Sequence, residues 1–219
     1  MKVRNINEKD FDSILKLDKQ VYPTENPVTK KILKKWYSKN PEFGLIYEKN
    51  ESVSGLCIAI PLNKSGWEKL VLGNISEADL DESLIFDKLR DSQIAIHVYH
   101  IEKLDDKIES FHNIVLKDLN EVISNLRIRN PLLKVVGFSG LCVTPSGIEL
   151  FKNKLNCKER TYFSSEYIFV KNNKKYLFNL TDSSKILTLI KEGYVLVNRC
   201  NMLVSFPSEK SIIWENIVA

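Results

Sequence analysis

The fold is decided by the stretch that begins with Ile94-Ala-Ile-His-Val-Tyr-His-Ile101. Its β-branched and aromatic residues are typical of a buried strand. From Asn113 onward, apolar residues recur at spacings of three and four, which predicts a helix that ends before Pro131. Leu133-Lys-Val-Val-Gly-Phe138 then predicts a second buried strand, and Thr144 can cap a further helix. This order of strand, helix, strand and helix predicts two parallel strands joined by a right-handed crossover.

The stretch resembles the acetyl-CoA-binding half of the GCN5-related N-acetyltransferases, the GNAT superfamily. The resemblance is closest at Ile96-His-Val-Tyr-His-Ile101, which is similar to a strand of arylalkylamine acetyltransferases. Pro145 to Lys158 looks like the family's fourth helix and the turn into its next strand. The resemblance implies an α/β fold of the acyl-CoA N-acyltransferase type, with a mixed sheet and a central parallel strand pair. The expected GNAT-like domain spans residues 1–170, and residues 171–219 are expected to pack on it as a C-terminal extension.

In this family, backbone amides at the start of the helix hold the coenzyme pyrophosphate, and helix N-termini favour anions in general. The family loop reads Gln or Arg, two residues, Gly, one residue, and Gly or Ala. The best alignment puts Lys107, Ser110 and His112 at these positions, and a shift by one residue puts Ile108, Phe111 and Asn113 there. Neither alignment contains a glycine, so side chains fill space beside the amides.

The resemblance also assigns residues to roles in coenzyme binding. Many family members use a tyrosine of the fourth helix as general acid, and the matching position is Lys152, or Phe151 if the helix is shifted by one. The full set of expected coenzyme-binding residues is Ile101, Lys103, Lys107, Ser110, Phe111, His112, Asn113, Ser146 and Lys152.

His97 is the candidate catalytic base, because a histidine at this position helps to deprotonate the amine in the arylalkylamine acetyltransferases. An imidazole near its usual pKa can accept a proton at neutral pH. The alternatives are Glu102 as base, and a His97 that is simply buried and hydrogen-bonded to a neighbour. Strand alternation puts His97 and Tyr99 on one face and His100 on the other, so the two histidines are not expected to share a metal.

The leading hypothesis is an N-acetyltransferase that moves acetyl from acetyl-CoA to an amine of a small molecule or a protein by direct attack. The alternative is a member of the fold that has lost catalysis and binds a ligand or a protein. A nucleic-acid-binding module is disfavoured, because the net charge of +4 is spread through the chain.

Composition fits an ordinary soluble chain, with 219 residues of which 43% are hydrophobic and 27% charged. The four cysteines form no close pair, which argues against a metal site and favours a reducing, cytoplasmic location. No apolar run approaches the roughly 20 residues that span a bilayer, so no membrane contact is expected.

Two further expectations concern geometry. The parallel strands are expected to separate near Ile101 and near Gly137 to Gly140, because glycines in a strand mark bulges or close approaches. A helix is expected around Leu80 to Leu89, with acidic residues that would favour a cationic acceptor if they border the cleft.

Overall fold

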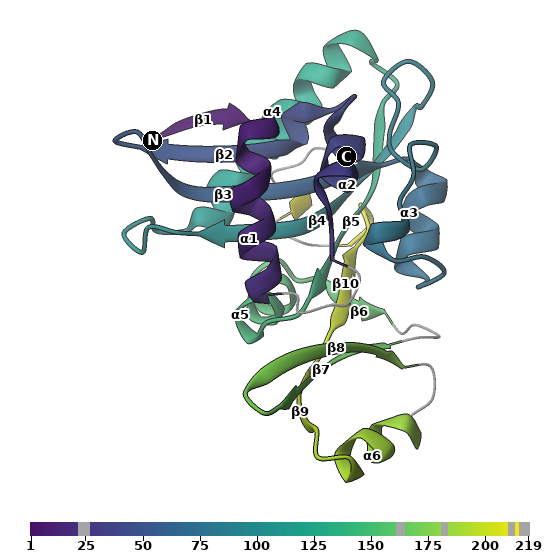
Figure 1. Ribbon diagram of the computed structural model, residues 1–219. Helices are drawn as coiled ribbons and strands as arrows, with labels where there is room; N and C mark the ends of the chain where they lie inside the picture. Colours follow the sequence, from purple (N-terminus) through teal and green to yellow (C-terminus); the bar gives the residue numbers. More distant parts are fainter. Residues whose placement is uncertain (22–26, 161–164, 181–183, 210–212, 215–219) are drawn as a thin grey trace.

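The computed structural model describes residues 1–21, 27–160, 165–180, 184–209 and 213–214. Its strands form a main sheet of seven strands in the order β1-β2-β3-β4-β5-β10-β6 and a second sheet of three strands in the order β8-β7-β9 (Figure 1). The main-sheet strands are β1 (Lys2–Asn5), β2 (Gly44–Lys49), β3 (Ser52–Leu62), β4 (Gln93–Lys103), β5 (Lys134–Cys142), β10 (Asn201–Ser205) and β6 (Lys158–Arg160). The second sheet consists of β7 (Ser165–Lys171), β8 (Lys174–Leu180) and β9 (Val195–Arg199).

Among the described residues, five helices accompany the main sheet, and a sixth lies between two strands of the second sheet in the sequence. They are α1 (Phe11–Val21), α2 (Lys30–Tyr37), α3 (Lys64–Val71), α4 (Phe111–Arg129), α5 (Pro145–Ile148) and α6 (Ser184–Lys191). Short 3-10 helices are η1 (Glu8–Asp10), η2 (Pro41–Phe43) and η3 (Glu77–Asp79), and a π-helical turn, η4 (Glu149–Lys154), continues α5. None of these helices combines the length and the apolarity that crossing a membrane requires.

β4 and β5 are parallel neighbours that are joined by α4. Six residues of α4 are buried in the main core, and those after its first turn follow the expected spacing: Phe111, Val115, Leu116, Leu119, Ile123 and Leu126. On its other edge β4 pairs antiparallel with β3, so the sheet is mixed. The expected fold class, α/β with a mixed sheet and a central parallel pair, is confirmed.

The parallel pair separates after Val98 and Gly140, which are the last paired residues. Beyond this point β4 continues alongside β3, and β5 continues alongside β10. The strands were expected to separate at Gly137 to Gly140. They remain paired through Gly140, so this part of the prediction is wrong, and the separation begins only beyond this glycine. A bulge at Val136 precedes it, because Ile94 pairs with Val135 and Ala95 with Gly137.

Both glycines of β5 allow an aromatic ring to lie directly on the strand. A Cβ atom at Gly137 would come within 2.1 Å of the Trp67 ring, and one at Gly140 within 2.6 Å of the Phe151 ring. The expectation that these glycines mark a close approach of another part of the chain is therefore confirmed.

A second bulge changes the faces of β4. Ala59 of β3 pairs with Val98 and Ile58 pairs with His100, so Tyr99 is the extra residue. As a result, the Tyr99 hydroxyl and the His100 imidazole both contact Asp18 of α1. The expected alternation of Tyr99 and His100 is wrong, because a bulge resets the period of two.

The connection between β3 and β4 contains a helix, but not the expected one. α3 covers Lys64–Val71, whereas Leu80, Leu84 and Phe86 are buried in irregular backbone. The acidic side chains of this segment close local turns instead of forming a helical face: Asp79 accepts from Ser76, and Asp81 from Ser83. The predicted helix at Leu80 to Leu89 is wrong, since Leu80, Leu84 and Phe86 reach the core from irregular backbone and Leu89 is exposed.

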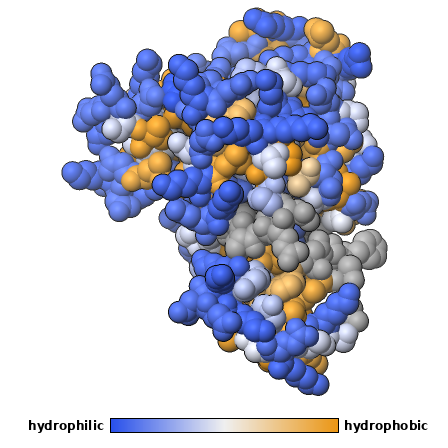
Figure 2. Space-filling model, in the orientation of Figure 1, coloured by the Kyte–Doolittle hydropathy of each residue, from blue (hydrophilic) through white to orange (hydrophobic). Residues whose placement is uncertain are grey.

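The chain after residue 170 contributes to both sheets. β8 and β9 pair with β7 in the second sheet, α6 lies between them in the sequence, and β10 returns between β5 and β6 of the main sheet. Figure 2 shows apolar side chains on the lower part of the molecule, where the second sheet lies, and its exposed apolar residues include Leu187, Val195 and Val197. The division into residues 1–170 and an extension stays a prediction.

Candidate functional site

A cavity of about 130 Å³ lies where β4 and β5 separate, and we call it the splay cavity. Its lining includes Ile101 and Glu102 of β4, Leu141 of β5, Ser146 of α5 and Phe151 of η4. Because β4 has left β5 here, its backbone groups on that side face the gap, as on a sheet edge. An extended ligand can therefore bond to the strand itself, which is the manner in which sheets add a peptide-like partner.

The N-terminus of α4 offers backbone donors. Among the described residues, no acceptor is bonded to the amides of Ser110, Phe111 and His112. Ser110 has φ 48° and ψ 39°, the left-handed conformation that glycine adopts most easily. In the best sequence alignment, Ser110 occupies the first glycine position of the family loop. The backbone thus keeps the shape that the glycine would give, which favours this alignment over the one shifted by one residue.

A positive charge lies near the same helix end. The pKa of His112 is lowered, first by burial and then by the Lys154 ammonium group, so η4 approaches the start of α4. Lys154 was not among the expected residues, whereas the expected Lys152 is an exposed residue of η4.

The other expected coenzyme-binding residues take different positions. The ring of Phe111 is buried against Tyr47, so Phe111 can contribute only its backbone. Lys103 lies 3.9 Å from the Asp106 carboxylate at the surface. The exposed Lys107 carries an amide that is bonded to Asp105, and Asn113 turns its amide to the Ser110 carbonyl.

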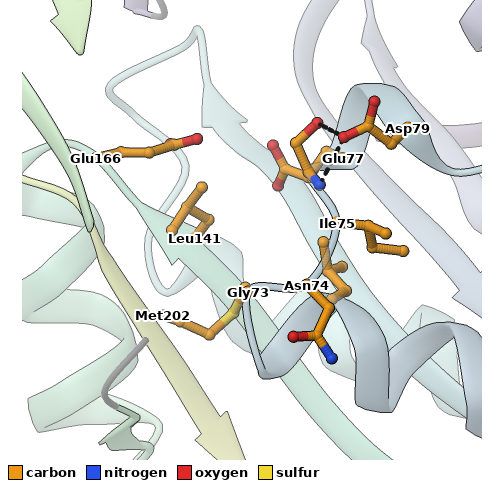
Figure 3. Close-up of a pocket in the computed structure, with 10 residues that line it drawn as sticks. Gly73, Asn74, Ile75, Glu77, Asp79, Leu141, Glu166 and Met202 are labelled. Atoms are coloured by element: carbon orange, nitrogen blue, oxygen red, sulfur yellow. Dashed lines mark hydrogen bonds between the residues drawn. The ribbon is translucent and has the colours of Figure 1, made fainter. Parts of the chain in front are cut away.

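A second cavity, of about 270 Å³, lies on the other side of β5, and we call it the Glu77 cavity. Figure 3 shows Glu77 of η3 and Glu166 of β7 entering it from opposite walls. Met202 of β10 and Leu141 of β5 complete the wall between them. Leu141 is the one described residue that lines both cavities, so the two cavities adjoin at this residue.

His97 does not reach either cavity. Its side chain is fully buried, with Nδ1 at 2.9 Å from Ser139 Oγ and Nε2 at 2.7 Å from Glu77 Oε1. The indole Nε1–H of Trp67 donates to the same Ser139 oxygen over 2.9 Å. The structure thus shows the alternative of a buried, hydrogen-bonded histidine, and the role of His97 as catalytic base stays a prediction.

Burial sets the proton affinities of the groups around the Glu77 cavity. It lowers the pKa of His97 to about 3, which keeps the imidazole neutral. It raises the pKa of Glu77 to about 8 and that of Glu166 to about 7. Glu77 and Glu166 are therefore the groups of this cavity that exchange a proton near neutral pH.

A third carboxylate lies behind the bulge of β4. Asp18 is 1% exposed, accepts from the Tyr99 hydroxyl and lies 3.4 Å from His100 Nε2. Its Oδ2 atom has no hydrogen-bond partner among the described residues. No three His, Cys, Asp or Glu side chains of the described residues form a group that could hold a metal ion.

The sequence did not indicate three acidic residues of this region, Glu77, Glu166 and Asp18. A signal existed only for Glu166, a charged residue within an apolar strand-like run. Part of that run, residues 162–164, lies outside the described residues.

Comparison with known proteins gives matches of structure but not of sequence. No protein-family model and no curated protein matches the chain. Solved structures with a similar fold include GphF, a GNAT-like decarboxylase in complex with isobutyryl-CoA, at 10% identity over 94% of this chain and 99% of that chain, with a TM-score of 0.47. Ribosomal-protein-alanine N-acetyltransferase from Brucella melitensis is 13% identical over 94% and 99% of the two chains, with a TM-score of 0.43.

Arabidopsis thaliana Naa50, in complex with the bisubstrate analogue CoA-Ac-MVNAL, is 9% identical over 93% and 97% of the two chains, with a TM-score of 0.47. At this level, the likeness assigns neither an activity nor a substrate to the chain. The order of the strands, the parallel pair and its separation agree with the resemblance found in the sequence. In its topology, the chain has a fold similar to that of the GCN5-related N-acetyltransferases.

Proposed function

We propose that the protein transfers an acyl group, acetyl in the simplest case, from coenzyme A to an amine by direct attack. The observation that carries this proposal is the position of Leu141 between the two cavities. A donor held in the splay cavity and an acceptor held in the Glu77 cavity would meet at this side chain. Holding two reactants at contact distance is a large part of catalysis by itself.

The splay cavity and the start of α4 suit the coenzyme. The amides of Ser110, Phe111 and His112 can donate to a pyrophosphate, and Lys154 adds positive charge nearby. The edge of β4 at Ile101 can bond to the amide groups of the pantetheine arm. Acetyl-CoA would supply the thioester whose carbonyl carbon the amine attacks.

The Glu77 cavity suits a cationic acceptor. Glu77 and Glu166 face it with carboxyl groups, and each can attract an ammonium group when it is ionised. Glu77 is our candidate base in place of His97, because it faces the cavity and its pKa of about 8 lies near the operating pH. The alternative base, Glu102, lies on the donor side.

The thiolate can leave without a general acid from the fourth helix. Phe151 lies in the splay cavity at one of the two positions aligned with the family's tyrosine, and its ring cannot donate a proton. A thiol of pKa about 8.5 is a tolerable leaving group even so. The same observation favours the second candidate function, a non-catalytic protein that binds coenzyme A.

Binding and catalysis can be tested separately. Acetyl-CoA and coenzyme A should raise the thermal unfolding temperature, and a nucleotide that lacks pantetheine should raise it less, because a ligand of the folded state stabilises it by mass action. Glu77→Gln should keep this shift and lower turnover of an amine by roughly 10²-fold or more.

The controls separate the two candidate functions. A thermal shift without turnover of any amine would favour the binding protein. Absence of a shift with either coenzyme would overturn both, and unchanged turnover in Glu77→Gln would remove Glu77 as the base.

A further inference from the structure

We propose that Trp67, Ser139 and His97 act as positioning residues that hold the Glu77 carboxyl group and couple its protonation to the tautomer of His97. This inference deepens the proposed function, on which it rests only for its effect on turnover.

The four groups form one hydrogen-bonded chain through the core. Successive contacts are 2.9 Å from Trp67 to Ser139, 2.9 Å from Ser139 to His97 and 2.7 Å from His97 to Glu77. They come from α3, β5, β4 and η3, and the most exposed of the four side chains is only 8% exposed. The chain thus ties four elements to the wall of the Glu77 cavity.

The donors and acceptors fix the order of the protons when Glu77 is ionised. An indole N–H can only donate, so Ser139 Oγ accepts from Trp67. The Ser139 hydroxyl can then donate to His97 Nδ1, and His97 carries its proton on Nε2 and donates it to Glu77. Every polar side-chain atom from Trp67 Nε1 to Glu77 Oε1 has a partner in this arrangement.

A Glu77 that carries its proton on Oε1, the oxygen that contacts His97, requires another arrangement. Its hydroxyl donates to His97 Nε2, so His97 carries its proton on Nδ1 and donates to Ser139. The Ser139 oxygen then faces two donors, and its own hydrogen must turn away from His97. Among the described residues, Ser139 has no third side-chain or backbone acceptor for that hydrogen. Loss of a proton from Glu77 Oε1 therefore switches the His97 tautomer and the Ser139 hydroxyl together.

The hydrogen-bonded chain positions Glu77 but offers no exit for its proton. The indole of Trp67 cannot accept a proton, so transfer along the chain ends at Ser139. Gly137 leaves the space that the Trp67 ring occupies, since any side chain there would displace the ring.

Other ionisable groups also face Glu77 from the elements packed around it. They are Asp18 of α1, Tyr99 and His100 of β4, Cys142 of β5, Glu166 of β7 and Cys200 before β10. Asp79 lies on the same short helix and is bonded to Ser76. The test must therefore measure a property of the hydrogen-bonded chain from Trp67 to Glu77, rather than one that responds to the total charge around Glu77.

The NMR signals of the tryptophan indoles, recorded on the whole protein, provide this measurement. Trp67 and Trp214 each donate to a serine hydroxyl, over 2.9 Å to Ser139 and 2.8 Å to Ser205, but only Ser139 is bonded to a histidine. In ¹H–¹⁵N spectra, the Trp67 indole signal should move with pH around the Glu77 midpoint of about 8, while the Trp214 signal stays fixed. Glu77→Gln should abolish the movement, and Glu166→Gln should keep it.

A Trp67 signal that does not titrate, or that titrates unchanged in Glu77→Gln, would overturn the coupling. These spectra need no turnover, so they stand or fall independently of the proposed function. In an active enzyme, Ser139→Ala should move the pH midpoint of kcat/KM upward by roughly half a unit, because it removes the bond that favours ionised Glu77. A lower kcat/KM with the midpoint unchanged would mean that Ser139 has only a structural role.

Discussion

Burial acts on Glu77 and His97 in the same way but with opposite results for their pKa values. Both groups are deprived of water, which disfavours the charged form of each. The carboxyl therefore holds its proton more tightly and the imidazole less tightly. The pair is neutral in total over a wide range of pH, with the proton on Glu77.

This distribution predicts how stability depends on pH. Between pH 6.5 and 8 the unfolded chain has released a proton that folded Glu77 still binds, so its contribution to stability falls as pH rises. Between pH 4.5 and 3 unfolded His97 binds a proton that the folded chain excludes, so stability falls as pH falls. Between pH 4.5 and 6.5 the two slopes are opposite and cancel.

Urea unfolding at several pH values measures this effect. The free energy of unfolding of the wild type should fall by up to about 2 kcal/mol more than that of Glu77→Gln between pH 6.5 and 8. Glu166, whose pKa is also raised, contributes a fall of the same sign in both proteins, so the difference isolates Glu77. Parallel curves would mean that Glu77 ionises normally in the folded protein.

The residues of the site were predictable only in part. His97 was found through the resemblance of its strand to that of the arylalkylamine acetyltransferases. Its role was left open, because a strand pattern does not say which residues lie across from it. Glu77 lies 20 residues before His97, in a 3-10 helix of three residues that has no periodic signal. Their contact is a product of tertiary packing, which no local pattern records.

Among the elements, α4 and its flanking strands were the strongest prediction from the sequence, whereas the loop before α4 matches the family pattern least, because it lacks the glycines. The helix and both flanking strands follow from apolar spacing, and the structure contains all three. The bulge at Tyr99 and the helix α3 could not be predicted, because one depends on pairing with β3 and the other has only a short apolar face.

Ser110 offers a test of this loop. Glycine adopts a positive φ without the steric cost of about 1 kcal/mol that other residues meet, so Ser110→Gly should raise the free energy of unfolding by up to that amount. Removing the side chain should also leave coenzyme affinity unchanged or increase it, since the amides become more accessible.

Ser110→Ala is the matched control, because it removes the hydroxyl and keeps the cost of the left-handed conformation. Urea unfolding and thermal shifts with coenzyme A measure both variants. Equal stability of the glycine and alanine variants would show that the backbone at this position relaxes at no cost, and weaker coenzyme binding by the glycine variant would argue for a role of the serine side chain.

In the whole molecule, the second sheet completes the Glu77 cavity. β7 brings Glu166 to the wall opposite η3, and β10 carries the chain back into the main sheet beside β5. The chain has a net charge of +4, yet the described lining of this cavity contains three acidic residues, Glu77, Asp79 and Glu166. A local acidic field in a basic protein selects a cationic acceptor more sharply than the total charge would suggest.

Glu166 should therefore determine the affinity for the acceptor rather than the rate of the chemical step. Its pKa of about 7 means that it gains charge as pH rises through neutrality, so KM for a cationic alkylamine should fall over that range. In Glu166→Gln, KM should rise by roughly tenfold or more at pH above 7, with kcat changed less and its pH dependence lost. Glu102→Gln, which removes a carboxylate from the splay cavity, is the control and should leave KM for the amine unchanged. An aromatic amine that is neutral at pH 7 should show no dependence on Glu166, and equal effects on both amines would mean that Glu166 supports the fold instead of binding the cation.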